Sequence, residues 1–125
     1  MQSIFISHVF EDKKYLDKIK KWENKKELEG YKCTFETEDK RHEGKEAIRK
    51  HLKDKIRGAS IILVLIGDNT HNHNWIETEV ELANSIHKKI CCIRIPETHG
   101  RKPDILSNYT ELMFNPNQIM KELKK

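Results

Sequence analysis

The chain has 125 residues, of which 36% are hydrophobic and 35% charged, and this length favours a single domain over residues 1–125 with one core. Its net charge of +4 is too small to indicate a nucleic-acid partner, and no platform of aromatic and basic residues accompanies this charge. No membrane span or signal peptide is visible, and the 3 cysteines lie in apolar surroundings, so we expect a reduced, cytoplasmic protein with no membrane partner.

Apolar strands and amphipathic helices alternate along the chain. The unbroken apolar run 61–66 predicts a strand that is buried on both faces, and the alternation over residues 31–36 predicts an edge or half-exposed strand. Gly30 is interpreted as the stop of the first helix. The expected strands are 3–7, 31–37, 60–66, 89–95 and 110–114, and the expected helices are about 11–27, 45–57, 74–87 and 116–123.

This alternation predicts an α/β fold, with a central parallel sheet of about five strands and helices on both faces. Ligands of such folds bind at the carboxyl ends of the strands. The candidate site residues gather at that edge of the sheet. They are Ser7, His8 and Phe10 after the first strand, the charged loop 38–44 after the second, Asp68 and Asn69 after the third, and Trp75 and Glu79 on the following helix.

Glu79 is placed differently from the other acids of its helix. A projection at about 100° per residue puts Glu77 and Glu81 on the polar side, whereas Glu79 lies in the apolar arc between Trp75 and Ala83. Burying an unpaired charge is costly, so this carboxylate must be paired, hydrogen-bonded or open to a pocket. Glu79 is therefore the strongest functional candidate, the structural alternative being an acid satisfied by the helix dipole.

The other candidates also have structural interpretations. Trp75 and Phe10 suit the core as well as a pocket wall, and Asp68 suits a turn. Ser7 and His8 suit capping and packing of the first helix.

Metal binding and thiol chemistry are not expected. His71 and His73 flank Asn72, but no second cluster at ligand spacing accompanies them. Cys91 and Cys92 are neighbours in a strand and point to opposite faces, which favours buried structural cysteines.

The order of motifs resembles a protein family. The run Phe5-Ile6-Ser7-His8 precedes an Asp-bearing helix start, and Trp75 and Glu79 stand four residues apart after a hydrophobic third strand. This pattern resembles TIR domains, and more specifically the bacterial TIR-like branch of Thoeris antiphage defence. The resemblance covers nearly the whole chain and implies a flavodoxin-like TIR fold.

The resemblance also implies an activity. It implies cleavage of NAD⁺ at the nicotinamide–ribose bond, with Glu79 as the catalytic residue and NAD⁺ as the substrate rather than a cofactor. It implies substrate contacts at Ser7, His8, Phe10, Asp68, Asn69 and Trp75. The implied product is an ADP-ribose-derived signalling nucleotide that activates a separate effector protein, and self-association through TIR contacts is implied as well.

The residues suit this chemistry, but two other classes of protein share the architecture or the family. Cleavage creates an oxocarbenium-like centre on the ribose that one carboxylate can stabilise, and nicotinamide departs neutral. The alternative function is a non-catalytic TIR scaffold that acts by self-association or partner recruitment. A phospho-acceptor receiver domain is disfavoured, because Ser7 and His8 stand where that class needs paired acids.

Overall fold

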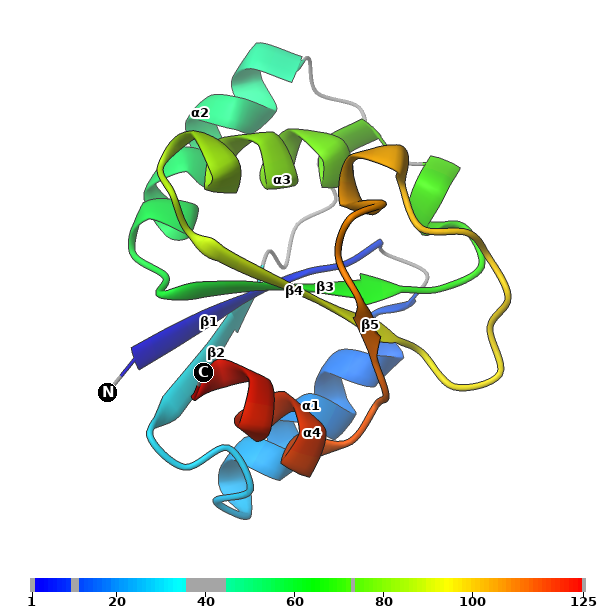
Figure 1. Cartoon of the computed structure of the whole chain (residues 1–125). Coiled ribbons are helices and arrows are strands. Elements are labelled where there is room, and N and C mark those ends of the chain that lie inside the picture. Colours follow the sequence, from blue (N-terminus) through cyan, green and yellow to red (C-terminus); the bar gives the residue numbers. More distant parts are fainter. Residues whose placement is uncertain (1, 10–11, 36–44, 73, 125) are drawn as a thin grey trace.

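The structure is a computed structural model that describes residues 2–9, 12–35, 45–72 and 74–124 (Figure 1). Its strands are β1 (Gln2–Ser7), β2 (Tyr31–Phe35), β3 (Ile61–Ile66), β4 (Lys89–Arg94) and β5 (Glu111–Leu112). Its helices are α1 (Lys14–Asn24), α2 (Lys45–Arg57), α3 (Asn74–Ser85) and α4 (Pro116–Leu123), with short 3₁₀ helices η2 (Thr70–Asn72) and η3 (Asp104–Leu106).

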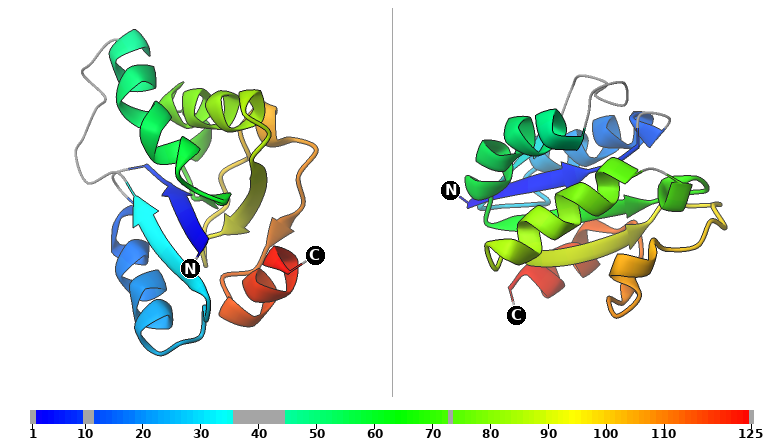
Figure 2. Two further views of the ribbon diagram at one scale, coloured as in Figure 1. Left: turned by 90° about the vertical axis from the view of Figure 1, so that its left-hand side faces the viewer. Right: turned by 90° about the horizontal axis from the view of Figure 1, so that it is seen from above.

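The five strands form one sheet in the order β2-β1-β3-β4-β5, and every neighbouring pair is parallel. The predicted fold class is therefore confirmed. All six residues of β3 are buried at the centre of the sheet, as the apolar run predicts, and β2 lies at an edge. Helices cover both faces, with α2 and α3 on one side and α1 and α4 on the other (Figure 2).

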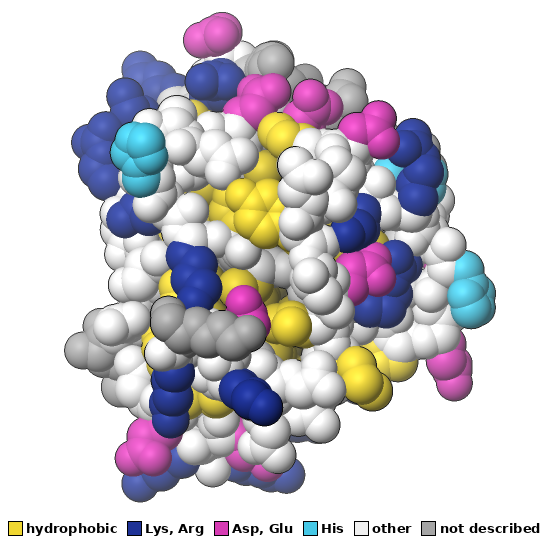
Figure 3. Space-filling view, viewed as in Figure 1, with side chains coloured by type: hydrophobic (Ala, Val, Ile, Leu, Met, Phe, Trp, Pro, Cys, Tyr) yellow, Lys and Arg dark blue, Asp and Glu magenta, His cyan; other side chains and the backbone are white. Residues whose placement is uncertain are grey.

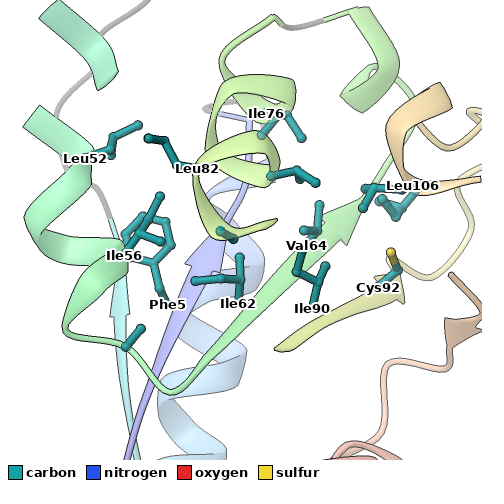
Figure 4. Close-up of a cluster of buried hydrophobic side chains, with 14 of the residues drawn as sticks. Phe5, Leu52, Ile56, Ile62, Val64, Ile76, Leu82, Ile90, Cys92 and Leu106 are labelled. Atoms are coloured by element: carbon teal, nitrogen blue, oxygen red, sulfur yellow. The ribbon is translucent and has the colours of Figure 1, made fainter. Parts of the chain in front are cut away.

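Two hydrophobic clusters hold the three layers together. Phe5, Ile62 and Val64 meet α2 and α3 on one face (Figure 4). Ile4 and Leu63 point to the other face and belong to the cluster that includes residues of α1 and α4. Cys92 belongs to the first cluster and Cys91 to the second, so the prediction that these neighbours point to opposite faces is confirmed.

The predicted bounds of α2 and α4 are confirmed, whereas the prediction for the first helix, 11–27, was too long. The helix begins at Lys14 and ends at Asn24. Lys26 has a φ of 62°, in the left-handed region, so the helix ends well before Gly30. Gly30, with a φ of 90°, makes the turn into β2, and its carbonyl accepts a hydrogen bond from the Gln2 amide at 3.0 Å.

Several other predicted elements were too long by a few residues. The third helix ends at Ser85 rather than 87, because His87 adopts a φ of 58° and turns the chain into β4. The last strand is Glu111–Leu112 rather than 110–114, because only Cys92 and Ile93 of β4 pair with it. The third strand begins at Ile61 rather than 60, and the fourth strand ends at Arg94 rather than 95. Residues 36–37 of the predicted second strand lie outside the described part.

Both described chain ends lie at the edge where the strands begin, opposite the carboxyl edge (Figures 1 and 2). On the face shown in Figure 3, hydrophobic side chains are visible between α3 and the segment leading to β5, with charged side chains around them. No described helix is long and apolar enough to cross a membrane.

Candidate functional site

The carboxyl end of β1 brings Ser7 next to Glu79 of α3. The Ser7 hydroxyl donates a hydrogen bond to Oε1 of Glu79 over 3.2 Å, between residues 72 positions apart in the sequence. Ser7 is 0% exposed and Glu79 is 3% exposed. The predicted burial of Glu79 on the apolar side of its helix is therefore found, and the carboxylate is hydrogen-bonded as such burial requires.

The packing of α3 explains this placement. Ile76, Val80 and Ala83 are all 0% exposed and fix the face of the helix that meets the sheet. In β1, Phe5 belongs to the same cluster, and Ser7 comes two residues later on the same face of the strand. A carboxylate on the inner face of α3 thus meets the first polar side chain at the end of β1.

The three acids of α3 have different surroundings, as the projection predicts. Glu77 is exposed, whereas Glu81 pairs with Arg49 of α2 over 3.4 Å, with each side chain 36% exposed. Thr78, which the sequence did not single out, is buried beside Glu79 in the chain with 3% exposure. The buried side of α3 is thus more polar at its amino-terminal half than the apolar pattern indicated.

The side chains of Ser7 and His8 point to different faces of the sheet. The ring of His8 meets Phe35 of β2 edge to face, with 6.3 Å between centroids and an interplanar angle of 83°. Phe35 packs against the cluster of the α1 and α4 face, whereas Ser7 faces α3. The capping half of the structural alternative is wrong, since the N-cap of α1 is Lys13, whereas His8 does pack, through Phe35, on the face that α1 covers.

A second polar region lies where β1, β3 and β4 end. A cavity of about 330 Å³ is lined by Asp12, Lys14 and Tyr15 after β1, by Asp68 and Asn69 after β3, and by Pro96, Glu97 and Thr98 after β4. β1 and β3 are neighbours whose following helices cover opposite faces, so the cavity lies at the topological switch point, where ligands of this architecture bind. The predicted residues Asp68 and Asn69 line it, whereas Glu79 is not part of its described lining.

Close contacts between backbones shape this cavity. A Cβ atom on Gly100 would stand 2.3 Å from the carbonyl oxygen of Asp68 and 2.4 Å from that of Gly67. A Cβ atom on Gly67 would stand 2.6 Å from Oδ2 of Asp12. Glycine is required at position 100, where a side chain would meet backbone oxygens, whereas at position 67 a side chain would meet the end of the Asp12 side chain.

Hydrogen bonds fix the loop after β4 in place. Oδ1 of Asp68 accepts a hydrogen bond from the His99 amide over 2.7 Å, and the Arg94 guanidinium donates to the Gly100 carbonyl over 2.6 Å. Arg94 also forms an ion pair with Glu111 of β5. Asp68 therefore connects the loop after β3 to the loop after β4, and it lines the cavity as well.

Several residues that build this edge were not singled out from the sequence. Thr70 is 0% exposed, accepts a hydrogen bond from the Gly67 amide over 2.8 Å and donates one to the Leu65 carbonyl. Asp12 was interpreted only as an acid at a helix start, and Arg94 not at all. The glycines at positions 67 and 100 were the available signal, because each marks a close approach.

Some predicted site residues lie outside the part that the structure describes. They are Phe10 and the charged loop 38–44. Trp75 belongs to the backbone of α3, but its side chain is outside the described part.

Neither a metal centre nor a reactive thiol is found in the described residues. Among residues 2–9, 12–35, 45–72 and 74–124, no group of three or more His, Cys, Asp or Glu side chains could hold a metal ion. Burial raises the pKa of the Cys33 and Cys92 thiols to about 12, and it also raises the pKa of Cys91. Thiols with such pKa values are poor nucleophiles at neutral pH.

The chain matches a known family pattern, and its fold recurs in solved structures. The family model described as "Thoeris protein ThsB, TIR-like domain" matches residues 5–100. None of the curated proteins matches the chain. The TIR domain of the Toll-related receptor TRR-2 from Hydra magnipapillata is 17% identical, with a TM-score of 0.64 over 97% of this chain and 87% of that one.

Two other solved structures share the arrangement. A 2-desoxiribosyltransferase from Leishmania mexicana is 11% identical, with a TM-score of 0.65 over 99% of this chain and 98% of that one. A prokaryotic SEFIR domain is 19% identical, with a TM-score of 0.57 over 99% of this chain and 88% of that one. At these identities the likeness shows the fold alone.

Proposed function

The chain belongs to the family of TIR-like domains of the Thoeris protein ThsB, and from this premise we propose that it is an NAD⁺-cleaving enzyme. It breaks the nicotinamide–ribose bond and makes an ADP-ribose-derived signalling nucleotide in antiphage defence, which addresses a separate effector protein. The observation that supports this proposal most is the carboxylate of Glu79, which is 3% exposed and hydrogen-bonded at the carboxyl edge of the sheet.

Glu79 suits the charge that this reaction creates. Departure of neutral nicotinamide leaves an oxocarbenium-like ribose, and a negative carboxylate beside that ribose lowers the energy of the transition state. Apolar surroundings strengthen this effect, because charges interact more strongly away from water. Ile76, Val80 and Ala83, all 0% exposed, provide such surroundings along the same helix.

Substrate binding has to uncover Glu79. With only 3% of the residue exposed, the ribose reaches the carboxylate only after neighbouring groups move aside. We propose that His8, Phe10 and Trp75 contact the substrate near Glu79. Asp68 and Asn69 contact it from the cavity, where carboxylate and amide groups can bond the hydroxyls of a ribose.

Nicotinamide release tests this function directly. The purified chain is incubated with NAD⁺, with and without lysate of phage-infected cells, and the products are followed by chromatography and mass spectrometry. We expect Glu79→Gln and Glu79→Ala to slow nicotinamide release by about 10²–10³-fold, the effect of removing one group that stabilises a transition-state charge.

The matched control is Glu77→Gln, which removes an exposed acid from the same helix and should leave the rate unchanged. A Glu79→Gln variant that cleaves NAD⁺ as fast as the parent chain would remove Glu79 from the mechanism.

The second candidate function is a TIR scaffold that acts by self-association or partner recruitment. It is favoured by the enclosure of Glu79 and by the described cavity lining, which does not include that residue. Light scattering over a range of concentrations measures self-association. A chain that assembles but releases no nicotinamide under either condition would favour the scaffold over the enzyme.

A further inference from the structure

Ser7 occupies a rigid position with no access to solvent. It is 0% exposed and is the last residue of β1, where it is in register with Val64 of the fully buried strand β3. β1 has a strand on each side, and Ser7 directly follows Ile6, which is in register with Phe35 of β2 and Leu63 of β3. The direction of the Ser7 hydroxyl is therefore set by the sheet rather than by a mobile loop.

Glu79 is the opposite kind of residue, because its side chain has three rotatable bonds and extends from a helix whose buried face is largely apolar. Ile76, Val80 and Ala83 on the same side of α3 are apolar and 0% exposed. The orientation of the carboxyl group therefore depends on the polar groups that reach it. The Ser7 hydroxyl is one of them, at 3.2 Å from Oε1.

We propose that Ser7 is a positioning residue for Glu79 rather than a substrate contact. Its hydroxyl, carried on the rigid end of β1, holds the Glu79 carboxylate in the orientation in which it meets the ribose. The proposal rests on the function proposed above. It assigns Ser7 a different role from the substrate contact that the sequence resemblance implies, because the hydroxyl is 0% exposed and donates its one proton to Glu79.

Steady-state kinetics with NAD⁺ distinguish a positioning role from a binding role. Ser7→Ala removes the donor and nearly keeps the volume, and we expect kcat to fall about tenfold, the usual worth of one hydrogen bond to a charged group. KM should stay within about twofold, because the interaction lost is with the enzyme's own carboxylate and not with the substrate. Ser7→Thr retains the hydroxyl and should restore most of kcat.

The matched control is Thr34→Val. Thr34 also donates a strand hydroxyl to an internal acceptor, the Ile4 carbonyl, over 3.4 Å, but it lies in β2 away from Glu79. Its loss should lower stability slightly and leave kcat unchanged.

Thermal unfolding supplies a second measurement that needs no activity. Ser7→Ala is compared in the parent chain and in a Glu79→Met background, where an unbranched side chain of similar length cannot accept the hydrogen bond. If Ser7 holds the carboxylate, Ser7→Ala lowers Tm in the parent and lowers it less in the Glu79→Met background, so the two shifts are not additive.

The two measurements separate the proposal from the function on which it rests. A parent chain that releases no nicotinamide counts against the enzyme, and the thermal comparison still decides whether Ser7 holds Glu79. Additive Tm shifts overturn the proposal. It is also overturned by a Ser7→Ala variant with full kcat, or by one in which only KM rises, since that result would make Ser7 a substrate contact.

Discussion

The two faces of the sheet end differently at its carboxyl edge. On the face covered by α2 and α3, the hydrophobic cluster continues up to Ser7 and Glu79, which are 0% and 3% exposed. On the side of α1, the edge opens into a cavity of about 330 Å³ whose lining includes Asp12, Asp68 and Glu97. Carboxylates thus stand both in an enclosed setting and in an open one at the same edge of the sheet.

One edge of the sheet therefore carries two kinds of carboxylate, one buried and one around an open cavity. A carboxylate among apolar side chains interacts strongly with a nearby charge, because little water screens it. Carboxylates around an open cavity are screened and are better suited to accept hydrogen bonds from a polar ligand. The enclosed side is held by side-chain packing, whereas the open side is held by backbone contacts at Gly67 and Gly100.

The largest effect on the free energy of unfolding is expected from alkaline pH. It tests whether the interiors of the two faces are alike although their carboxyl edges differ. Burial raises the pKa of Cys33 on one face and of Cys92 on the other from 9.0 to about 12. Between these values the unfolded chain loses thiol protons that the folded chain keeps. The free energy of unfolding is therefore unaffected below pH 9 and falls as the pH rises toward 12, by at most about 1.4 kcal/mol per pH unit for each thiol.

Denaturant titrations at pH 7, 9 and 10.5 measure this loss. Cys33→Ala and Cys92→Ala should each remove a similar share of it, because burial is the main cause at both positions. If one variant removed the whole pH dependence, the interiors of the two faces would differ as much as their edges do.

The next largest effect is expected from Gly100→Ala, which disturbs the packing of the loops around the cavity. The added Cβ would meet two backbone oxygens at 2.3 Å and 2.4 Å, so the loop after β4 has to shift. We expect a loss of about 1–3 kcal/mol in the free energy of unfolding, the usual cost of overpacking. Gly67→Ala is the matched control, since its added Cβ meets only the end of the Asp12 side chain, which can move aside. Equal losses in the two variants would contradict the assignment of the Gly100 contact as the more rigid one.

A smaller effect is expected from Arg94→Ala. Arg94 connects the Gly100 carbonyl to Glu111 of β5, and the two charged side chains are 25% and 28% exposed, so solvent screens the pair. We expect a loss of about 1 kcal/mol in chemical denaturation. Arg101→Ala removes a more exposed pair with Asp104, whose side chains are 63% and 92% exposed, and should cost nothing measurable. If Arg101→Ala lowered the free energy of unfolding as much as Arg94→Ala, the position of Arg94 in the structure would be unimportant.

The smallest effect is expected from Asn69→Ala, which compares the functions of the open and enclosed sides. If the open side binds part of NAD⁺ and the enclosed side carries the chemistry, this variant should raise KM about three- to fivefold with kcat unchanged. Steady-state nicotinamide release measures both constants, with the exposed Asn108→Ala as control. A fall in kcat without a change in KM would place Asn69 in the chemical step instead.

Local patterns predicted the elements of the fold, because the hydrophobic periodicity was unambiguous. The run 61–66 gave the central strand, and the bounds of α2 and α4 followed from their apolar spacing and from Pro116 at the start of α4. The end of the first helix did not follow. Its left-handed residue is Lys26, with a φ of 62°, inside a lysine-rich stretch where glycine would have been the signal.

The candidate site was predictable only where one element determined it. The inward position of Glu79 follows from the period of α3, but its contact with Ser7 joins residues 72 positions apart and depends on how the helix crosses the sheet. The cavity depends on three loops meeting, and the role of Asp12 there rests on its approach to Gly67. Such contacts are set by tertiary packing, which periodicity does not describe.

The position of the described chain ends has a practical consequence. The marked chain ends lie at the edge where the strands begin, away from the carboxyl edge (Figures 1 and 2). A tag, a fluorescent fusion or a biosensor linker attached at either end would therefore extend away from the carboxyl edge. Immobilisation through either end should accordingly leave the carboxyl edge open to solvent, and both ends offer anchoring points for single-molecule measurements.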